Sequence, residues 1–213
     1  MAQASAPPRT RLPREERMEQ TVGAAHALFA DRGYTAVTMD DVAAEVGVTK
    51  PLLYHYFGNK ERLYLACLER SGDALVETIL GAVATTGTSA EALGAGLRAF
   101  FAFVDDDRAA WGVLFDETLP AGGEIAERVG VYRSRLSDLV AGALLEQIPA
   151  SRRNRARVEV EALSAAVLGA AEALARWWLR TGALSAAEVA DLLVASLEPG
   201  LRRRSAPRRG AAR

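Results

Sequence analysis

The chain of 213 residues lacks several features that mark particular classes of protein. Its single cysteine, Cys67, cannot form an internal disulfide, which favours a reducing compartment. Its longest weakly polar stretch, residues 162–179, is interrupted by Glu172 and Arg176, so no segment is expected to span a membrane. The N-terminal charges have no apolar core behind them, unlike those of a secretory signal. These absences together predict a cytoplasmic protein.

Groups that perform catalysis or bind metals are also scarce. Only two histidines are present, His26 and His55, and they fall on separate expected helices. No Cys/His cluster has the spacing of metal ligands, no glycine-rich loop follows a strand, and no nucleophile elbow appears. The sequence therefore predicts a protein that is not an enzyme, with no catalytic residues, no metal and no cofactor.

Charge is unevenly distributed along the chain. Residues 1–65 carry eight basic and eight acidic side chains, whereas residues 66–201 carry twelve basic and nineteen acidic ones. The last twelve residues add six arginines and no acid. Basic ends of this kind are either arms that contact phosphates or simply disordered, and both readings stay open. We expect a basic disordered arm at 1–13 and an Arg-rich disordered tail at 202–213.

Apolar residues recur with the helical period of 3.6 along almost the whole chain, which predicts an all-α fold of about nine helices. The expected helices cover residues 13–33, 39–46, 49–58, 59–84, 88–105, 108–117, 124–147, 151–180 and 186–201. Three polar pairs are expected to begin helices as capping boxes: Thr38 with Asp41, Thr88 with Glu91, and Ser185 with Glu188. The expected domains are a small one at 14–58 and a larger one at 59–201.

Residues 38–57 have the pattern of a helix-turn-helix. Ala43 supplies a small residue where two short helices cross, and Gly47 tolerates the positive φ of a tight turn. Apolar residues then occupy the positions that must be buried, which are Val42, Val46, Val48, Leu53 and Tyr56. Because the second helix of such a motif enters the major groove, the pattern predicts that residues 38–57 read DNA. We call this helix-turn-helix the DNA reader.

Polar side chains suited to DNA cluster on and after this second helix. Lys50 and Lys60, the only lysines of the chain, can donate to guanine and to phosphate, respectively. The hydroxyls of Tyr54 and Tyr56 can reach phosphate, and His55 can contact either a base or a phosphate. Tyr56 also occupies a core position of the motif, and that alternative stays open.

Residues 14–65 resemble the N-terminal domain of the tetracycline-repressor (TetR) family. The run GYTAVTMDDVAAEVGVTKPLLYHYFGNKERL carries the family's signature, including the aromatic-rich LYHYF. The resemblance implies an all-helical dimeric transcription regulator, usually a repressor that a small ligand releases from a palindromic operator. The positions that it assigns to DNA contact are Thr38, Thr49, Lys50, Tyr54, His55, Tyr56 and Lys60. Leu52 departs from the small residues common in the family and is a candidate for apolar contact with a thymine methyl.

The last two expected helices are predicted to pair two copies of the chain. Between Val158 and Leu179 the charges fall mainly at Glu161, Glu172 and Arg176. A helix that is apolar over most of its circumference must be covered on more than one side, and two such hairpins can form a four-helix bundle. The alternative is that both helices fill the core of one chain.

The middle of the chain is expected to hold a small, largely apolar ligand. The ligand-binding candidates are Phe103, Trp111, Phe115 and Tyr132, although each could be a plain core residue. A ligand that shifts the helix at 59–84 would change the separation between the DNA-reading helices of the two paired copies. The competing readings are a helical binding or interaction protein with an idle DNA reader and, least favoured, an enzyme.

Overall fold

The structure, a computed structural model, describes residues 13–205, except for the side chains of residue 90 and of residues 198–205. This part of the chain contains nine helices and no strand, which confirms the predicted all-α class. The helices are α1 (Arg14–Ala36), α2 (Met39–Val46), α3 (Lys50–Phe57), α4 (Lys60–Ala84), α5 (Ser89–Asp106), α6 (Arg108–Leu114), α7 (Glu124–Glu146), α8 (Ala150–Thr181) and α9 (Ala186–Ser205).

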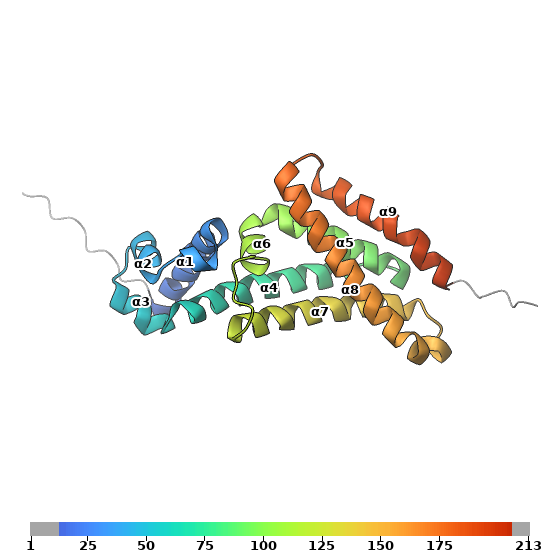
Figure 1. Ribbon diagram of the computed structural model, residues 1–213, viewed down its shortest axis with the longest axis horizontal. Helices are drawn as coiled ribbons and strands as arrows, with labels where there is room; N and C mark the ends of the chain where they lie inside the picture. The colour runs from blue at the N-terminus through green and yellow to red at the C-terminus, as the bar shows by residue number, and fades with distance from the viewer. Residues whose placement is uncertain (1–12, 206–213) are drawn as a thin grey trace, which may run out of the picture.

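The molecule is elongated, and its two ends are joined by α4 and by the packing of α6 on α1 (Figure 1). Helices α1 to α3 form one end, and α4 runs from them into a bundle of the later helices. Within that bundle α5, α6 and α7 pack against α4, α8 packs mainly on α7, and α9 packs mainly on α5. One apolar core continues through both ends, since Phe29 and Leu53 belong to the same cluster as Phe101 and Leu136.

Local sequence accounts for where the helices begin. The hydroxyl of Thr38 accepts the N–H of Asp41 at 3.2 Å, and the Asp41 carboxylate accepts the N–H of Thr38 at 2.8 Å, so this predicted capping box is present. The box of Ser185 and Glu188 is present in the same form. The third expected box is wrong, because the Thr88 side chain makes no capping bond at the start of α5.

Three helix ends differ from those expected, and one of them is the end of α6, which lies at Leu114 instead of residue 117. Gly33 breaks the helical geometry of α1 with φ 76°, but α1 resumes after this kink and ends at Ala36. Helix α9 reaches Ser205, so residues 202–205 are helical rather than part of a disordered tail. Arginine is a good helix former, and a run without acids does not by itself end a helix. The expected arm at 1–13, apart from Pro13, and the tail beyond 205 lie outside the described residues.

Candidate functional site: a DNA interface and two cavities

The turn between α2 and α3 has the geometry that the sequence predicts. Gly47 adopts the left-handed conformation (φ 69°, ψ 35°), where a side chain would be strained. The N–H of Val48 donates to the carbonyl of Ala43 at 3.0 Å, which closes the turn over the small residue. These contacts hold α3 at a fixed angle on α2 and leave its outer side exposed.

The apolar side of the motif faces inward. Val42 and Leu53 are fully buried, whereas Val46, Val48 and Tyr56 are partly buried against the same core. Tyr56 therefore serves as a packing residue, as one of the two readings had it, although part of its surface remains open. Its contact with DNA stays a prediction.

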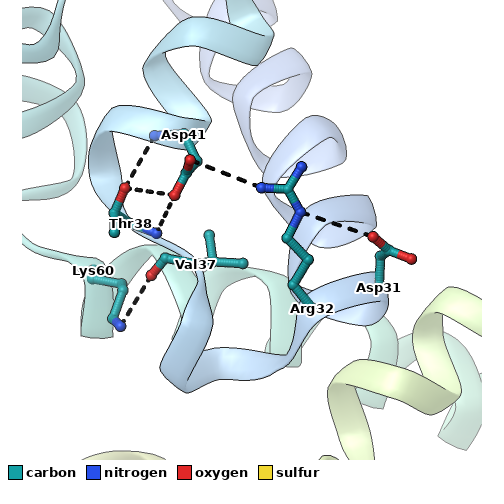
Figure 2. A network of polar contacts seen from close by, with 6 residues as sticks. All are labelled: Asp31, Arg32, Val37, Thr38, Asp41 and Lys60. Atoms are coloured by element: carbon teal, nitrogen blue, oxygen red, sulfur yellow. Dashed lines mark hydrogen bonds and ion pairs between the residues drawn. The ribbon is translucent and has the colours of Figure 1, made fainter.

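Thr38 lies in the polar network that fixes the start of α2 (Figure 2). Its hydroxyl donates to Oδ2 of Asp41 at 2.6 Å, and Oδ1 of Asp41 lies 3.8 Å from Nη1 of Arg32. The bond from the Thr38 hydroxyl, followed by that from its backbone N–H, lowers the pKa of Asp41. The single hydroxyl proton of Thr38 is therefore engaged within the chain, and any contact with phosphate would compete with Asp41.

Lys50, the first residue of α3, forms an ion pair across the motif. Its Nζ donates to Oδ2 of Asp40 in α2 at 2.8 Å, and this hydrogen bond raises the pKa of Lys50. Both side chains are about half exposed or more, at 49% and 64%. Because exposed ion pairs of this kind contribute little to stability, breaking this pair would cost little, and the contact of Lys50 with DNA stays a prediction.

The other reader candidates lie along α3 and its first cap. Thr49 is exposed at the N-cap of α3, where its side chain makes no capping bond, so its hydroxyl is available for a contact with DNA. Tyr54 is 42% exposed and His55 is also exposed, whereas Leu52 is partly buried. The structure brings these residues to one short helix, and their contacts with DNA stay predictions.

Lys60 has a structural role that the sequence reasoning missed. Its Nζ donates to the backbone carbonyls of Tyr34 at 3.0 Å and Val37 at 3.1 Å, and it lies 4.4 Å from the centre of the Tyr34 ring. Figure 2 shows the bond to Val37 beside the start of α2. An ammonium group has three donors, so one N–H is left for the expected phosphate contact.

The segment after α6 forms further hydrogen bonds to the end of α1. Oδ2 of Asp116 accepts the backbone N–H of Tyr34 at 2.6 Å, and its Oδ1 accepts the N–H of Thr118 at 2.7 Å. The hydroxyl of Thr35 donates to the carbonyl of Thr118 at 3.1 Å. Gly33 permits this approach, because a Cβ there would come within 2.9 Å of the Thr118 hydroxyl. We call residues 115–118 the bridging segment.

Two cavities lie in the bundle and share Phe115 and Leu136 in their walls. The first cavity, of about 580 Å³ with the open solvent at its mouth included, is lined by Ile79, Val83, Ala92, Leu93, Gly96, Leu97, Phe100, Phe115, Leu136, Leu139, Val140, Ala143, Leu168, Ala171 and Glu172. The second cavity, of about 320 Å³ on the same measure, is lined by Gly72, Leu75, Val76, Leu114, Phe115, Val129, Tyr132, Arg133 and Leu136.

Two of the four expected ligand-binding aromatics stand at these cavities. Phe115 lines both and Tyr132 lines the second. Trp111 stacks on Phe115 with ring centres 4.2 Å apart but lines neither cavity, and Phe103 is a buried core residue that lines neither. The walls are mainly aliphatic, so aromatic content was an incomplete guide to them. Ligand contact by these residues stays a prediction.

The charges at the two cavities neutralise each other. Arg133, in the wall of the second cavity, donates to Glu172, in the wall of the first, at 2.9 Å. The Tyr132 hydroxyl donates to Asp73 at 2.9 Å. Burial, followed by this hydrogen bond, raises the pKa of Tyr132 to about 12, so its hydroxyl stays protonated. The walls thus offer a ligand apolar surface and a paired, locally neutral polar patch.

Neither a metal site nor a membrane span is found among residues 13–205. No group of histidine, cysteine and carboxylate side chains in this range is arranged to hold a metal ion. No helix in it combines the length and apolar character needed to cross a bilayer. Cys67 is buried, and burial raises the pKa of its thiol to about 12. It is a core residue in the form of a neutral thiol.

Comparison with known sequences assigns both parts of the chain. Residues 22–67 match the family model described as bacterial regulatory proteins of the tetR family, and residues 89–198 match the tetracyclin repressor-like C-terminal domain. The chain is 36% identical to the HTH-type transcriptional activator FasR of Mycolicibacterium smegmatis over 169 residues, which cover 79% of this chain and 75% of FasR. It is 32% identical to the HTH-type transcriptional regulator BetI of Rhizobium meliloti over 130 residues, 59% of this chain and 64% of BetI.

Solved structures show the same architecture. A TetR-like transcriptional regulator from Rhodococcus sp. RHA1 matches with a TM-score of 0.75 and 32% identity, over 90% of this chain and 99% of that one. AibR, in complex with isovaleryl coenzyme A and operator DNA, shares the fold with a TM-score of 0.71 and 24% identity, over 86% of this chain and 98% of AibR. Together with the helix-turn-helix and the cavities, these matches place the chain in the TetR family of transcriptional regulators, with an N-terminal DNA-binding unit and a C-terminal ligand-binding domain.

Proposed function

We propose that the protein binds a palindromic operator as a homodimer and that an aliphatic ligand in the bundle changes its affinity for that operator. The observation that carries the proposal is the direct tie between cavity and reader: Phe115 lines both cavities, and Asp116 beside it bonds to Tyr34 at the end of α1. The site of action is the cytoplasm, as the sequence predicts.

Operator recognition would use the exposed side of α3. One short helix reads only a few base pairs, so two copies must present their readers one helical turn of DNA apart, about 34–36 Å. Lys50, Tyr54 and His55 would face base edges and phosphates, while the free donor of Lys60 would meet the backbone. A ligand that alters the separation of the two readers would weaken the fit to both half-sites at once.

The surface that would pair the two copies lies on α8. Between Val158 and Trp177 the exposed residues other than Glu159 and Glu161 share one face of the helix and are mostly small: Val158, Ala162, Ala165, Ala166, Gly169, Ala173 and Trp177. Small side chains let two backbones approach closely, and a two-fold axis brings the same face of each copy together. Leu192 on α9, which is 51% exposed, would extend this contact.

The class of ligand follows from the walls of the cavities. Aliphatic side chains predominate in both, and the charged residues Arg133 and Glu172 are paired with each other. Such a lining favours a hydrocarbon chain over a sugar, nucleotide or free ion. AibR, which shares the fold, is described in complex with isovaleryl coenzyme A, and this supports an acyl thioester as a candidate ligand. Fatty acids and acyl thioesters are therefore the probes of choice.

The direction of regulation is a separate part of the proposal. The sequence predicts a repressor that ligand releases, whereas FasR is named an activator. An enzyme is disfavoured because the named relatives are transcriptional regulators and because the cavity walls bring no nucleophile together with a base. Transcription from the operator in vitro, with and without protein and ligand, distinguishes repression from activation.

The test of the proposal is selection of genomic fragments by the purified protein at physiological salt, with and without a fatty acid. Enrichment of one short palindrome that binds two copies of the chain is the expected result. The matched variant is Gly169→Arg, which places charge in the centre of the α8 face and should abolish dimerisation and enrichment together, whereas exposed Gly130→Arg on α7 should leave both intact. Absence of enrichment from a folded dimer under either condition would support the idle-reader alternative.

A further inference from the structure

The two cavities differ in which part of α4 they touch. The first meets α4 at Ile79 and Val83, far from the DNA reader, and the second meets it at Gly72, Leu75 and Val76, closer to Lys60. We infer that one straight aliphatic chain, once too long for the first cavity, extends past Phe115 and Leu136 into the second, so that these two residues set the preferred chain length. The inference rests on the proposed function, in which the ligand is aliphatic.

The partition between the cavities is made of side chains that can move. Phe115 lies just after α6, outside any helix, with its ring stacked on Trp111 and edge-on to Phe100 at 6.4 Å. Leu136, on α7, is the other residue that lines both cavities. No backbone hydrogen bond must break for a rotation of either side chain, so a ligand can open the partition by changing rotamers.

The polar groups at the partition are arranged to tolerate a hydrocarbon. The ion pair of Arg133 and Glu172 joins the wall of one cavity to that of the other. Because each charge already has its partner, a methylene chain that passes beside them leaves no charge unpaired. A carboxylate or thioester head would face the solvent at the mouth of the first cavity rather than enter the second.

A chain in the second cavity would act directly on α4. The ring of Tyr132 packs so closely on Gly72 that a Cβ there would come within 2.5 Å of it. The same tyrosine is held to α4 by its bond to Asp73. A ligand that enters between Val76 and Val129 would press on this close contact between α4 and α7, so long chains and short chains should differ in their effect on the reader as well as in affinity.

The test compares two substitutions, each of which fills one cavity with a larger side chain. Val129→Phe fills the second cavity only, and Ala143→Phe fills the first cavity only. Binding of butanoic, octanoic, dodecanoic and hexadecanoic acids, and of their coenzyme A thioesters, is measured by calorimetry on the full-length dimer. For wild type, affinity should rise about fourfold per added methylene until both cavities are full.

Val129→Phe should stop this rise at a shorter chain, with affinity for the longest acids reduced at least tenfold and affinity for the shortest ones unchanged. Ala143→Phe should weaken short and long acids alike. Val129→Leu, a smaller plug, should give an intermediate limit and covers the case in which the phenylalanine variant fails to fold. Equal weakening of all lengths by the Val129 variants, or no effect, would overturn the two-cavity inference alone. If no acid or thioester binds folded wild type, the aliphatic ligand of the proposed function fails as well.

Discussion

The carboxylate of Asp116 accepts a hydrogen bond from the backbone N–H of Tyr34 at 2.6 Å, and this bond joins the wall of the cavities to the DNA-binding unit. On one side, Asp116 follows Phe115, which lines both cavities. On the other side, Tyr34 lies shortly before Thr38, the N-cap of α2. The carbonyl of Tyr34 accepts a hydrogen bond from Lys60 at the start of α4. The bridging segment thus connects the cavity walls to the DNA-binding unit in addition to α4 and to the packing of α6 on α1.

Removal of this bond should uncouple ligand from operator. A hydrogen bond to a charged acceptor contributes about 1.5–3 kcal/mol, which is of the size of typical coupling free energies. In Asp116→Ala, the ratio of operator Kd with and without fatty acid should shrink to within about twofold of one, while the Kd for the fatty acid itself stays close to wild type. Fluorescence anisotropy of labelled operator gives the ratio.

The matched control for this variant is Glu117→Ala. Glu117 is the next residue and an acid of the same region, but it pairs with Arg176 on α8 instead of with the DNA-binding unit. Its removal should leave the ratio at the wild-type value. A wild-type ratio in Asp116→Ala would show that the bridging segment does not carry the signal.

Lys60 should matter for stability as well as for DNA. Lys60→Met leaves the carbonyls of Tyr34 and Val37 without their donor, which should lower the free energy of unfolding by about 1–3 kcal/mol. If the remaining N–H contacts phosphate, the dependence of log K on log salt should also become less steep by about one unit. Lys50→Met, which loses only an exposed ion pair, should leave urea unfolding unchanged. Equal unfolding midpoints for Lys60→Met and wild type would contradict the structural role.

Lys50 should read sequence, and Asp40 should restrain it. Lys50→Ala is expected to reduce the preference for operator over a site with one changed base pair by about tenfold or more. Asp40→Asn removes the acidic partner at 2.8 Å and one negative charge from the reader, so it should tighten binding to operator. Competition binding with matched and mismatched duplexes measures both effects. Weakening of matched and mismatched sites to the same degree by Lys50→Ala would reassign Lys50 to the backbone.

His26 should make stability sensitive to mild acid. Its Nε2 lies 2.7 Å from Oγ of Ser71 on α4, and burial lowers its pKa below the ordinary 6.5, with Asp107 opposing and Arg70 reinforcing the shift. The unfolded chain therefore binds this proton more readily than the folded one. Stability from His26 should be complete above pH 6.5 and decrease as the pH falls below it.

The measurement is urea unfolding over a pH series, for wild type, His26→Gln and His55→Gln. Glutamine can keep a hydrogen bond to Ser71 but does not titrate, so His26→Gln should flatten the decrease between about pH 6.5 and pH 5. His55 is exposed, and its replacement should leave the slope as it is. An unaltered slope in His26→Gln would assign the acid sensitivity to other groups.

The helices and the reader could be predicted from the sequence because their causes are local. Helical periodicity, the Thr38 capping box and the positive φ of Gly47 each depend on residues within one or two turns. The predicted end of α9 was wrong, because the arginines that suggested a solvated tail are also good helix formers.

The ties between the parts could not be predicted in this way. The bond from Tyr34 to Asp116 joins residues far apart in sequence, and its donor is a backbone group that every residue possesses. Lys60 was recognised as a charge near DNA, but its carbonyl partners carry no sequence signal. The cavity walls are mostly aliphatic side chains that resemble any other core, so the sequence drew attention to aromatics such as Phe103 that lie elsewhere.

The most direct test of the account is the operator Kd of the wild-type protein with and without a saturating fatty acid of the chain length that binds most tightly. We expect the ligand to change this Kd by at least about fivefold, the lower end of typical allosteric coupling. A fatty acid that binds tightly in the bundle and leaves the operator Kd unchanged would contradict the coupling of the two cavities to the DNA reader.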